Sequence, residues 1–146
     1  MAGKANRQLE EEVTLSVIRK ADLLMQRITD LLKPYGLSPT QYNVLRILRG
    51  AGQNGASCKD IASRLIARDP DVTRLMDRLE KRGVLTRGRA PEDRRVVTHQ
   101  LTAEGLALVN ELDRPVHELH RATMRGIEPA KLRTLIAILD EIRIES

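Results

Sequence analysis

The chain has 146 residues and a formal net charge of +5, and its apolar content is almost wholly aliphatic, because it contains no Trp or Phe and only two Tyr. A chain of this length suits one domain or two small, closely packed ones. Its single cysteine, Cys58, excludes an intrachain disulfide framework and is typical of a reducing compartment. The sequence shows no signal region and no apolar run of membrane-spanning length, which predicts a cytoplasmic protein with no membrane association.

The first expected element is one long helix over residues 8–33. Apolar residues recur there at roughly helical spacing, and three glutamates from Glu10 onward lie in the first turns, where the helix dipole favours acidic side chains. Pro34 and Gly36 should end this helix.

Two shorter helices should follow. Ser38 is a suitable N-cap for the second, with Pro39 at its first position and Gln41 three residues after the cap, which is the pattern of a capping box. The glycine-rich stretch 50–55 is expected to be a loop, and Ser57 to cap a short third helix.

The fourth helix is predicted over residues 70–82. Asp69 is its expected N-cap, Pro70 its first residue, and Gly83 its left-handed C-terminal residue. Its apolar residues form one stripe at helical spacing, namely Val72, Leu75, Met76 and Leu79. Its polar residues gather on the opposite side, which centres on Arg74, Asp77 and Lys81 with Thr73 and Arg78 on the flanks.

A hairpin is predicted next, with β-branched runs at 84–87 and 96–101 joined by the turn-forming segment GRAPEDRR. Thr102 should cap a fifth helix that extends to about Arg125 and is kinked or broken at Pro115, and Pro129 should open a sixth. The predicted fold is mainly α with a small β-hairpin wing. Long apolar helix faces at both chain ends suggest pairing with a second copy of the chain.

A helix beside an arginine-tipped hairpin is the arrangement of a winged-helix DNA reader, and the charge distribution agrees. Residues 57–101 carry 11 basic and 7 acidic side chains, whereas residues 102–146 carry 6 and 8. A local excess of positive charge favours a polyanionic partner. The middle segment is therefore the expected nucleic-acid contact.

Two segments resemble those of MarR-type winged-helix transcriptional regulators. They are DVTRLMDRLEKRGVLTR, from Asp71 to Arg87, and DRRVVTHQLTAEG, from Asp93 to Gly105. The resemblance implies a homodimeric, sequence-specific regulator, most often a repressor, that binds a pseudo-palindromic double-stranded DNA operator. It also implies a winged helix-turn-helix over 37–101, flanked by long dimerisation helices over 1–36 and 102–146. Glu128 departs from the pattern, because a Ser or Thr helix cap is usual there.

The fourth helix is the expected recognition helix in the major groove. Arg74 can bind guanine O6 and N7, and Thr73 can contact a thymine methyl group or a base edge. For Asp71, a role at the helix start is favoured over acceptance from a cytosine amino group. Arg78 and Lys81 are expected to contact phosphates. The competing interpretation is that these are solvated charges.

The wing, residues 84–101, places Arg94 and Arg95 at its tip beside Asp93. The resemblance implies that Arg95 enters the minor groove and that Asp93 holds its side chain. A narrow A·T-rich minor groove concentrates negative potential, which attracts arginine. A flexible hairpin whose charges serve solubility is the alternative.

The resemblance also implies a small-molecule effector, often a phenolic or other lipophilic anion, bound where the two parts of the chain meet. Met25, Tyr42 and Arg46 are the candidates for that pocket. No cofactor or metal is expected, since His99, His117 and His120 do not form a convincing ligand set. Cys58 is expected to be a small, half-buried residue, with a redox sensor as the alternative.

No nucleophile–base pair, phosphate-binding loop or carboxylate dyad stands out, so an enzyme is not expected. A different class of function stays open: a winged-helix protein-interaction module that binds nucleic acid only non-specifically.

Overall fold

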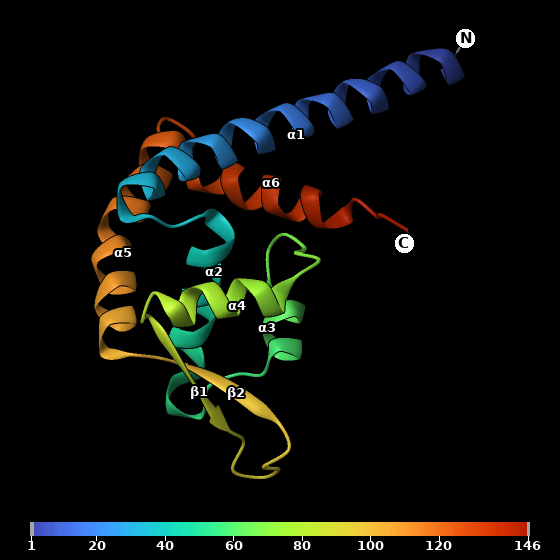
Figure 1. Ribbon diagram of the computed structural model, residues 1–146. Coiled ribbons are helices and arrows are strands. Elements are labelled where there is room, and N and C mark those ends of the chain that lie inside the picture. The colour runs from blue at the N-terminus through green and yellow to red at the C-terminus, as the bar shows by residue number, and fades with distance from the viewer. Residues whose placement is uncertain (1, 146) are drawn as a thin grey trace.

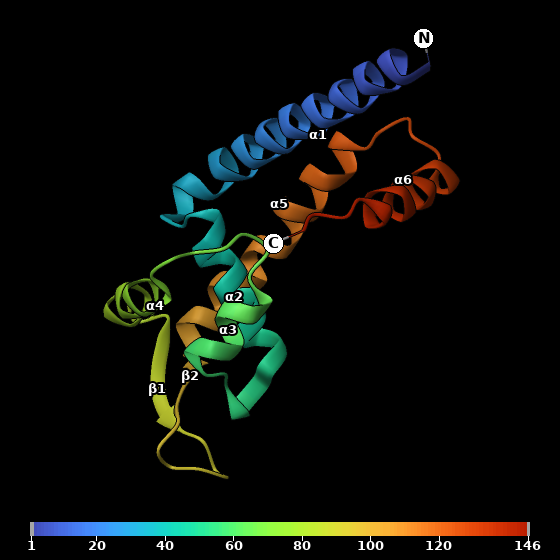
Figure 2. The ribbon, with the colours of Figure 1, turned by 90° about the vertical axis from the view of Figure 1, so that its right-hand side faces the viewer.

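The computed structural model describes residues 2–145, with side chains from residue 6 onward. Within that range the chain folds into six α-helices and a two-stranded hairpin. Helices α2, α3 and α4 and the hairpin form one lobe, and α5 leads from this lobe towards α1 and α6 (Figure 1). The hairpin points away from α1 and α6 at the opposite end of the molecule, as both views show (Figure 2).

Helix α1 spans Ala2–Leu32, so it begins six residues earlier than the predicted start. The added residues have no apolar periodicity that would predict a helix, although alanine, lysine and arginine among them are good helix formers. The predicted end is confirmed. A 3₁₀ turn, Lys33–Tyr35, contains Pro34, and Gly36 closes it at φ 67°, a left-handed conformation that favours glycine.

Helices α2, Pro39–Ala51, and α3, Cys58–Arg64, begin at the predicted serines. The capping box is confirmed, because Ser38 Oγ accepts from the N–H of Gln41 and the Gln41 side chain accepts from the N–H of Ser38. The stretch expected to be a loop is partly helical, since α2 continues to Ala51 and a 3₁₀ turn spans Gly52–Asn54.

Helix α4 spans Val72–Lys81, and its predicted start is wrong by two residues. Asp71, not Asp69, is the N-cap, and its Oδ1 accepts from the N–H of Arg74 at 3.1 Å. The side chain of Asp69 instead accepts from the N–H of Asp71 at 2.8 Å, a local turn that leaves Pro70 outside the helix. The C-terminal prediction is confirmed, with Gly83 at φ 82°.

Strands β1, Leu85–Arg89, and β2, Val97–Leu101, pair antiparallel with Leu85 opposite Leu101 and Arg89 opposite Val97. Thr102 then caps α5 and also joins the hairpin to α4. Its Oγ1 accepts from the N–H of Gly105 and donates to the carbonyl of Gly83. A Cβ on Gly105 would lie 2.0 Å from the Val84 carbonyl oxygen, so this close approach requires glycine.

Helix α5, Ala103–Thr123, continues through Pro115, so of the two predicted outcomes, a kink or a break, the break does not occur. Proline removes one backbone hydrogen bond, but the core positions Leu112 and Val116 on either side of it are buried and hold the helix in place. Helix α6, Pro129–Glu141, begins at Glu128 without a side-chain cap, and none of its residues is buried.

The core lies inside the lobe and under the end of α1. Its fully buried members come from α1, α2, α3, α4, β1 and α5: Leu32, Val44, Leu45, Leu48, Ile61, Met76, Leu79, Leu85, Val109 and Leu112. None of the helices in the described part of the chain is long and apolar enough to cross a membrane.

Candidate nucleic-acid interface

Helix α4 presents a polar face because its apolar stripe packs against or into the core. Leu75, Met76 and Leu79 are buried, whereas the residues predicted to contact DNA are all exposed: Thr73, Arg74, Arg78 and Lys81. The structure therefore places four of the predicted side chains together on the accessible surface of one helix.

Asp71 and Arg74 lie at the N-terminal end of that surface and contact each other. Asp71 Oδ2 is 3.3 Å from Arg74 Nε, and its other carboxylate oxygen caps the helix. The structure thus agrees with the capping interpretation of Asp71. The Arg74 side chain remains 71% exposed, so its guanidinium nitrogens are accessible to a ligand.

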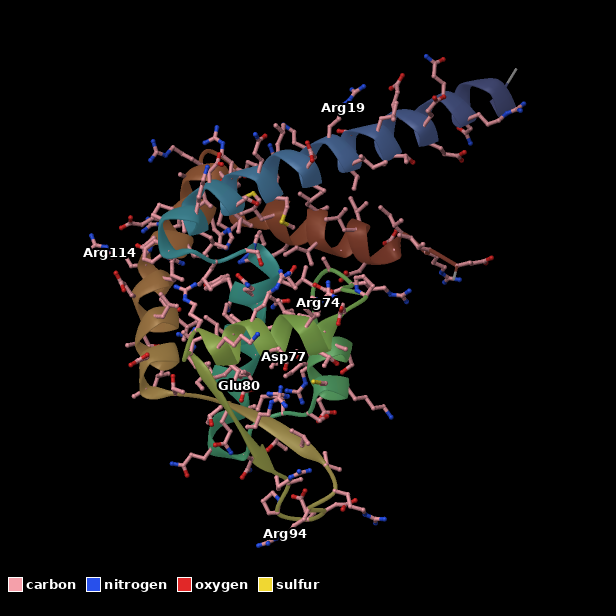
Figure 3. The ribbon with its side chains drawn as sticks, viewed as in Figure 1. Arg19, Arg74, Asp77, Glu80, Arg94 and Arg114 are labelled. Atoms are coloured by element: carbon pink, nitrogen blue, oxygen red, sulfur yellow. The ribbon has the colours of Figure 1, made fainter. Side chains whose placement is uncertain are left out.

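Arg87 connects the hairpin to α4, and the sequence interpretation missed this residue. Its Nε donates to Glu80 Oε2 at 2.5 Å, and its Nη2 donates to Asp77 Oδ1. Asp77 and Glu80 are labelled on α4 in Figure 3. The sequence pattern puts Asp77 at the centre of the polar side of α4, and the structure shows that it is paired with Arg87. The sequence signal for this contact is the pair of acidic residues, Asp77 and Glu80, three positions apart on an otherwise basic side of the helix.

Arg82, the C-cap of α4, connects the C-terminal end of this helix to the corner between α1 and α2, a contact that the sequence pattern does not predict. Its two terminal nitrogens donate to the carbonyl oxygens of Gly36 at 2.7 Å and Tyr35 at 2.5 Å. The left-handed glycine at this corner, Gly36, leaves the two carbonyl oxygens exposed, so a cationic side chain can donate hydrogen bonds to them. Helix α4 is therefore held at its C-terminal end by Arg82 as well as by the hairpin through Arg87.

The tip of the wing brings Asp93 and Arg95 together, and Arg94 lies at the far end of the hairpin from α4 (Figure 3). Asp93 Oδ1 accepts from the N–H of Arg95 at 3.0 Å and from its Nε at 3.2 Å. The Asp93 carbonyl accepts from the N–H of Val96 at 3.0 Å, which closes the turn. Arg95 itself is 92% exposed.

A surface pocket of about 490 Å³ lies between α2 and α5. Two of the three predicted pocket residues, Tyr42 and Arg46, line it, with the Arg46 guanidinium 6.0 Å from the centre of the Tyr42 ring. Met25, on α1, is not part of this lining. Burial raises the pKa of the Tyr42 phenol, and the positive charge of Arg46 opposes that shift. His117 and His120, which sequence reasoning left at the surface, also line the pocket.

The two helices that form this pocket are fixed to each other by an ion pair. Arg49 of α2 donates from both terminal nitrogens to the carboxylate of Asp113 on α5, at 2.8 and 2.9 Å, and also to Asn110. The hydrogen bond from Arg49 lowers the pKa of the Asp113 carboxyl.

Cys58 is half-buried, as expected, and lies at the start of α3 with its Sγ 3.4 Å from Nε2 of His99. Burial raises the pKa of the Cys58 thiol. Among residues 2–145, no group of three or more His, Cys, Asp or Glu is arranged to hold a metal ion.

Comparison with known proteins identifies the arrangement. Residues 37–97 match the model of the MarR family. An uncharacterized helix-turn-helix transcriptional regulator of Bacillus subtilis, YkoM, is 33% identical over 78% of this chain and 73% of its own length.

Two solved structures share the fold over most of the chain. The MarR transcription factor from Planctomyces limnophilus is 36% identical, with a TM-score of 0.69 over 90% of this chain and 96% of its own. CouR from Rhodococcus jostii, solved with p-coumaroyl-CoA, is 25% identical, with a TM-score of 0.78 over 94% of this chain and 98% of its own. The chain therefore belongs to the MarR family and is a DNA-binding transcriptional regulator.

Proposed function

We propose that this regulator is a homodimeric, ligand-responsive repressor that reads a pseudo-palindromic operator with α4 in the major groove and the wing in the minor groove. One observation carries the proposal: an exposed helix face bearing Thr73, Arg74, Arg78 and Lys81 stands beside a hairpin whose tip arginine is held by a carboxylate. The proposed reading lobe is residues 37–101, and residues 1–36 and 102–146 would form the dimer.

The exposed residues of α4 would make two kinds of contact with DNA, to base edges and to phosphates. Arg74, near the N-terminal end, has the reach and the donor pair to bind a guanine edge, and Thr73 can contact a base beside it. Arg78 and Lys81, further along the helix, would contact phosphates and supply affinity that does not depend on sequence. Asp71 would keep the helix start and Arg74 in place through its cap and ion pair.

The wing would add a minor-groove contact through Arg95, with Arg94 near the backbone of the DNA. Asp93 would restrict the Arg95 side chain before DNA binds, because one carboxylate oxygen already accepts from both its backbone and its side-chain nitrogen. An arginine that is ordered in advance loses less conformational entropy on insertion.

Dimerisation is supported by the apolar surface that the single chain leaves uncovered. Large aliphatic side chains of α1 and α6 are between 40% and 60% exposed: Leu9, Val13, Leu15, Val17, Ile18, Leu23, Leu135, Ile136, Ile138 and Leu139, with Ile142 just after α6. Monomeric proteins rarely expose apolar patches of this extent. Light scattering at micromolar concentration should give a dimer, and a stable monomer that binds the operator would contradict the proposal.

The pocket between α2 and α5 is the proposed effector site. Tyr42 offers an aromatic surface and Arg46 a positive charge, a combination that suits a phenolic or other lipophilic anion. The relative CouR was solved with p-coumaroyl-CoA, a thioester whose acyl group carries a phenol. Binding there would favour a spacing of the two recognition helices that does not fit the operator, a shift between two populated arrangements.

A gel-shift competition tests the DNA-binding proposal. The protein should bind DNA from upstream of its own gene, and unlabelled copies of the same DNA should compete far better than unrelated DNA at the same salt concentration. Equal competition by both would instead indicate a winged-helix module with only non-specific nucleic-acid binding. Footprinting should show two half-sites about 10 base pairs apart. A regulator of this kind would act on DNA in the cytoplasm, by binding and not by catalysis.

A further inference from the structure

The side chain of Arg82 joins α4, the proposed recognition helix, to the end of α1. Its Nη1 and Nη2 atoms donate to the carbonyl oxygens of Gly36 at 2.7 Å and Tyr35 at 2.5 Å. Both carbonyls belong to the corner that follows the last residue of α1, Leu32. The main packing partners of α4 are α3 and β1, so Arg82 gives this helix an additional, direct link to the end of α1.

Both ends of this link are fixed by backbone hydrogen bonds. On the α4 side, the N–H of Gly83 donates to the carbonyl of Glu80 at 2.9 Å and closes the helix. On the α1 side, the N–H of Gly36 donates to the carbonyl of Lys33 at 3.0 Å, and Leu32 just before this turn is fully buried. A guanidinium bound between two ordered turns holds them at one separation, which a mobile surface charge cannot do.

The guanidinium of Arg82 also fits the corner closely. A Cβ added to Gly36 would lie 3.3 Å from Arg82 Nη1 and 3.7 Å from its Cζ. Two N–H groups of one planar fork reach two consecutive carbonyls, a geometry that lysine cannot reproduce with its single ammonium nitrogen. The contact therefore depends on the shape of the guanidinium as well as on its charge.

We propose that Arg82 is a positioning residue that fixes the orientation of α4 relative to α1 and so sets the spacing of the two recognition helices. This inference rests on the proposed homodimer that reads two half-sites. Arg87 holds α4 to the hairpin through Glu80, so without Arg82 the helix and the hairpin would move together and the reading surface would stay intact. A dimer whose recognition helices vary in spacing accepts operators of more than one spacing. It binds the natural operator more weakly, because fewer of its conformations fit.

Fluorescence anisotropy with spacing variants of the operator tests the role of Arg82. The probes are the upstream DNA that footprinting defines, the same duplex with one or two base pairs inserted between the half-sites, and a duplex carrying one half-site alone. One inserted base pair shifts the second half-site by about 3.4 Å and turns it by about 34° around the DNA axis. The wild type should bind the lengthened duplexes at least about ten-fold more weakly than the natural one.

Three variants separate positioning from charge. Arg82→Met keeps most of the side-chain length but removes its donors. It should bind the single half-site as the wild type does, bind the natural operator roughly five-fold more weakly, and disfavour the lengthened duplexes by no more than about three-fold. Arg82→Lys keeps the charge but not the fork, so it should resemble Arg82→Met. Lys81→Met, the matched control at a proposed phosphate contact, should weaken binding to every duplex alike and keep the wild-type spacing preference.

Each variant should first show a cooperative thermal transition by circular dichroism, and loss of that transition in both Arg82 variants would overturn the inference. An unchanged spacing preference in Arg82→Met would also overturn it. So would an equal loss of affinity for the single half-site and the operator, which indicates a general structural role, or full recovery by Arg82→Lys, which indicates a direct phosphate contact. A wild type with no spacing preference would contradict the proposed dimeric reading itself, and this inference with it.

Discussion

Replacing Asp93 with alanine should weaken operator binding, even though it removes a negative charge from the surface that we propose faces DNA. Asp93 Oδ1 holds both the backbone N–H and the Nε of Arg95. Without that carboxylate the 92% exposed Arg95 side chain would sample many rotamers, and all but a few would be lost on entering the minor groove.

The size of the effect follows from those two contacts. A hydrogen bond to a backbone N–H contributes about 0.5–1.5 kcal/mol, and an exposed ion pair about 0.2–1 kcal/mol. Part of each contact is replaced by water in the variant, so we expect a loss of about 1 kcal/mol in DNA affinity, or roughly a five-fold higher Kd. The melting temperature should change little, because a hairpin tip contributes almost nothing to the core.

Two matched variants distinguish the loss of the Asp93 contacts to Arg95 from the loss of the Asp93 negative charge. Glu92→Ala removes the neighbouring carboxylate, for which the structure shows no hydrogen bond or ion pair among the described residues, so it should leave Kd unchanged or lower it slightly. Asp93→Asn removes the charge but keeps an oxygen that can accept from Arg95, so it should fall between alanine and the wild type. Fluorescence anisotropy at fixed salt measures all three. Tighter binding by Asp93→Ala would show that Asp93 is only a solvated charge.

Three further predictions concern α4 and the α2–α5 contact. Arg74→Ala should cost about 1–3 kcal/mol and relax preference at one base pair, whereas Lys81→Ala should weaken all sequences alike and reduce the salt slope by about one; a uniform loss in both would refute the base contact. Arg87→Leu should weaken DNA binding, because it leaves the carboxylates of Asp77 and Glu80 on α4 without their cationic partner. Neutralising both carboxylates in the same chain should restore affinity if Arg87 itself does not contact DNA. Asp113→Asn should destabilise the fold by at most about 1 kcal/mol at neutral pH, since the Asp113 side chain is 53% exposed. Because the hydrogen bond from Arg49 lowers the Asp113 pKa, the wild type should lose this advantage as the pH falls through that lowered pKa, which urea unfolding at several pH values can test.

The sequence predicted those features of the lobe that depend on local chemistry. The capping box at Ser38, the left-handed Gly83 and the buried stripe of α4 all follow from residues within one or two turns of each other, and all are confirmed. The predicted start of α4 was wrong, and the reason is also local. Asp69 and Asp71 are both good caps, and only the side-chain geometry shows that Asp69 forms a turn to Asp71 instead.

The contacts that hold α4 in place could not be predicted in the same way. Arg82 bonds to carbonyls 46 and 47 residues away, and those carbonyls become available only because the chain turns at Gly36. Arg87 meets its partners across the junction of a strand and a helix, where one register shift would point it elsewhere. Such pairings depend on the packing of whole elements, which residue spacing does not encode.

These long-range contacts bear on how an effector could act. Arg87 ties α4 to the hairpin, Arg82 ties it to the corner before α2, and Arg49 ties α2 to α5 through Asp113. A helix anchored at these points cannot easily slide against its own lobe, because any such movement would break charge-assisted hydrogen bonds. A ligand between α2 and α5 would therefore act most readily by turning the lobe as one body relative to α1 and α6. In a dimer that rotation changes the distance between the two recognition helices and leaves each reading surface intact, so an effector should lower affinity for paired half-sites much more than for a single one.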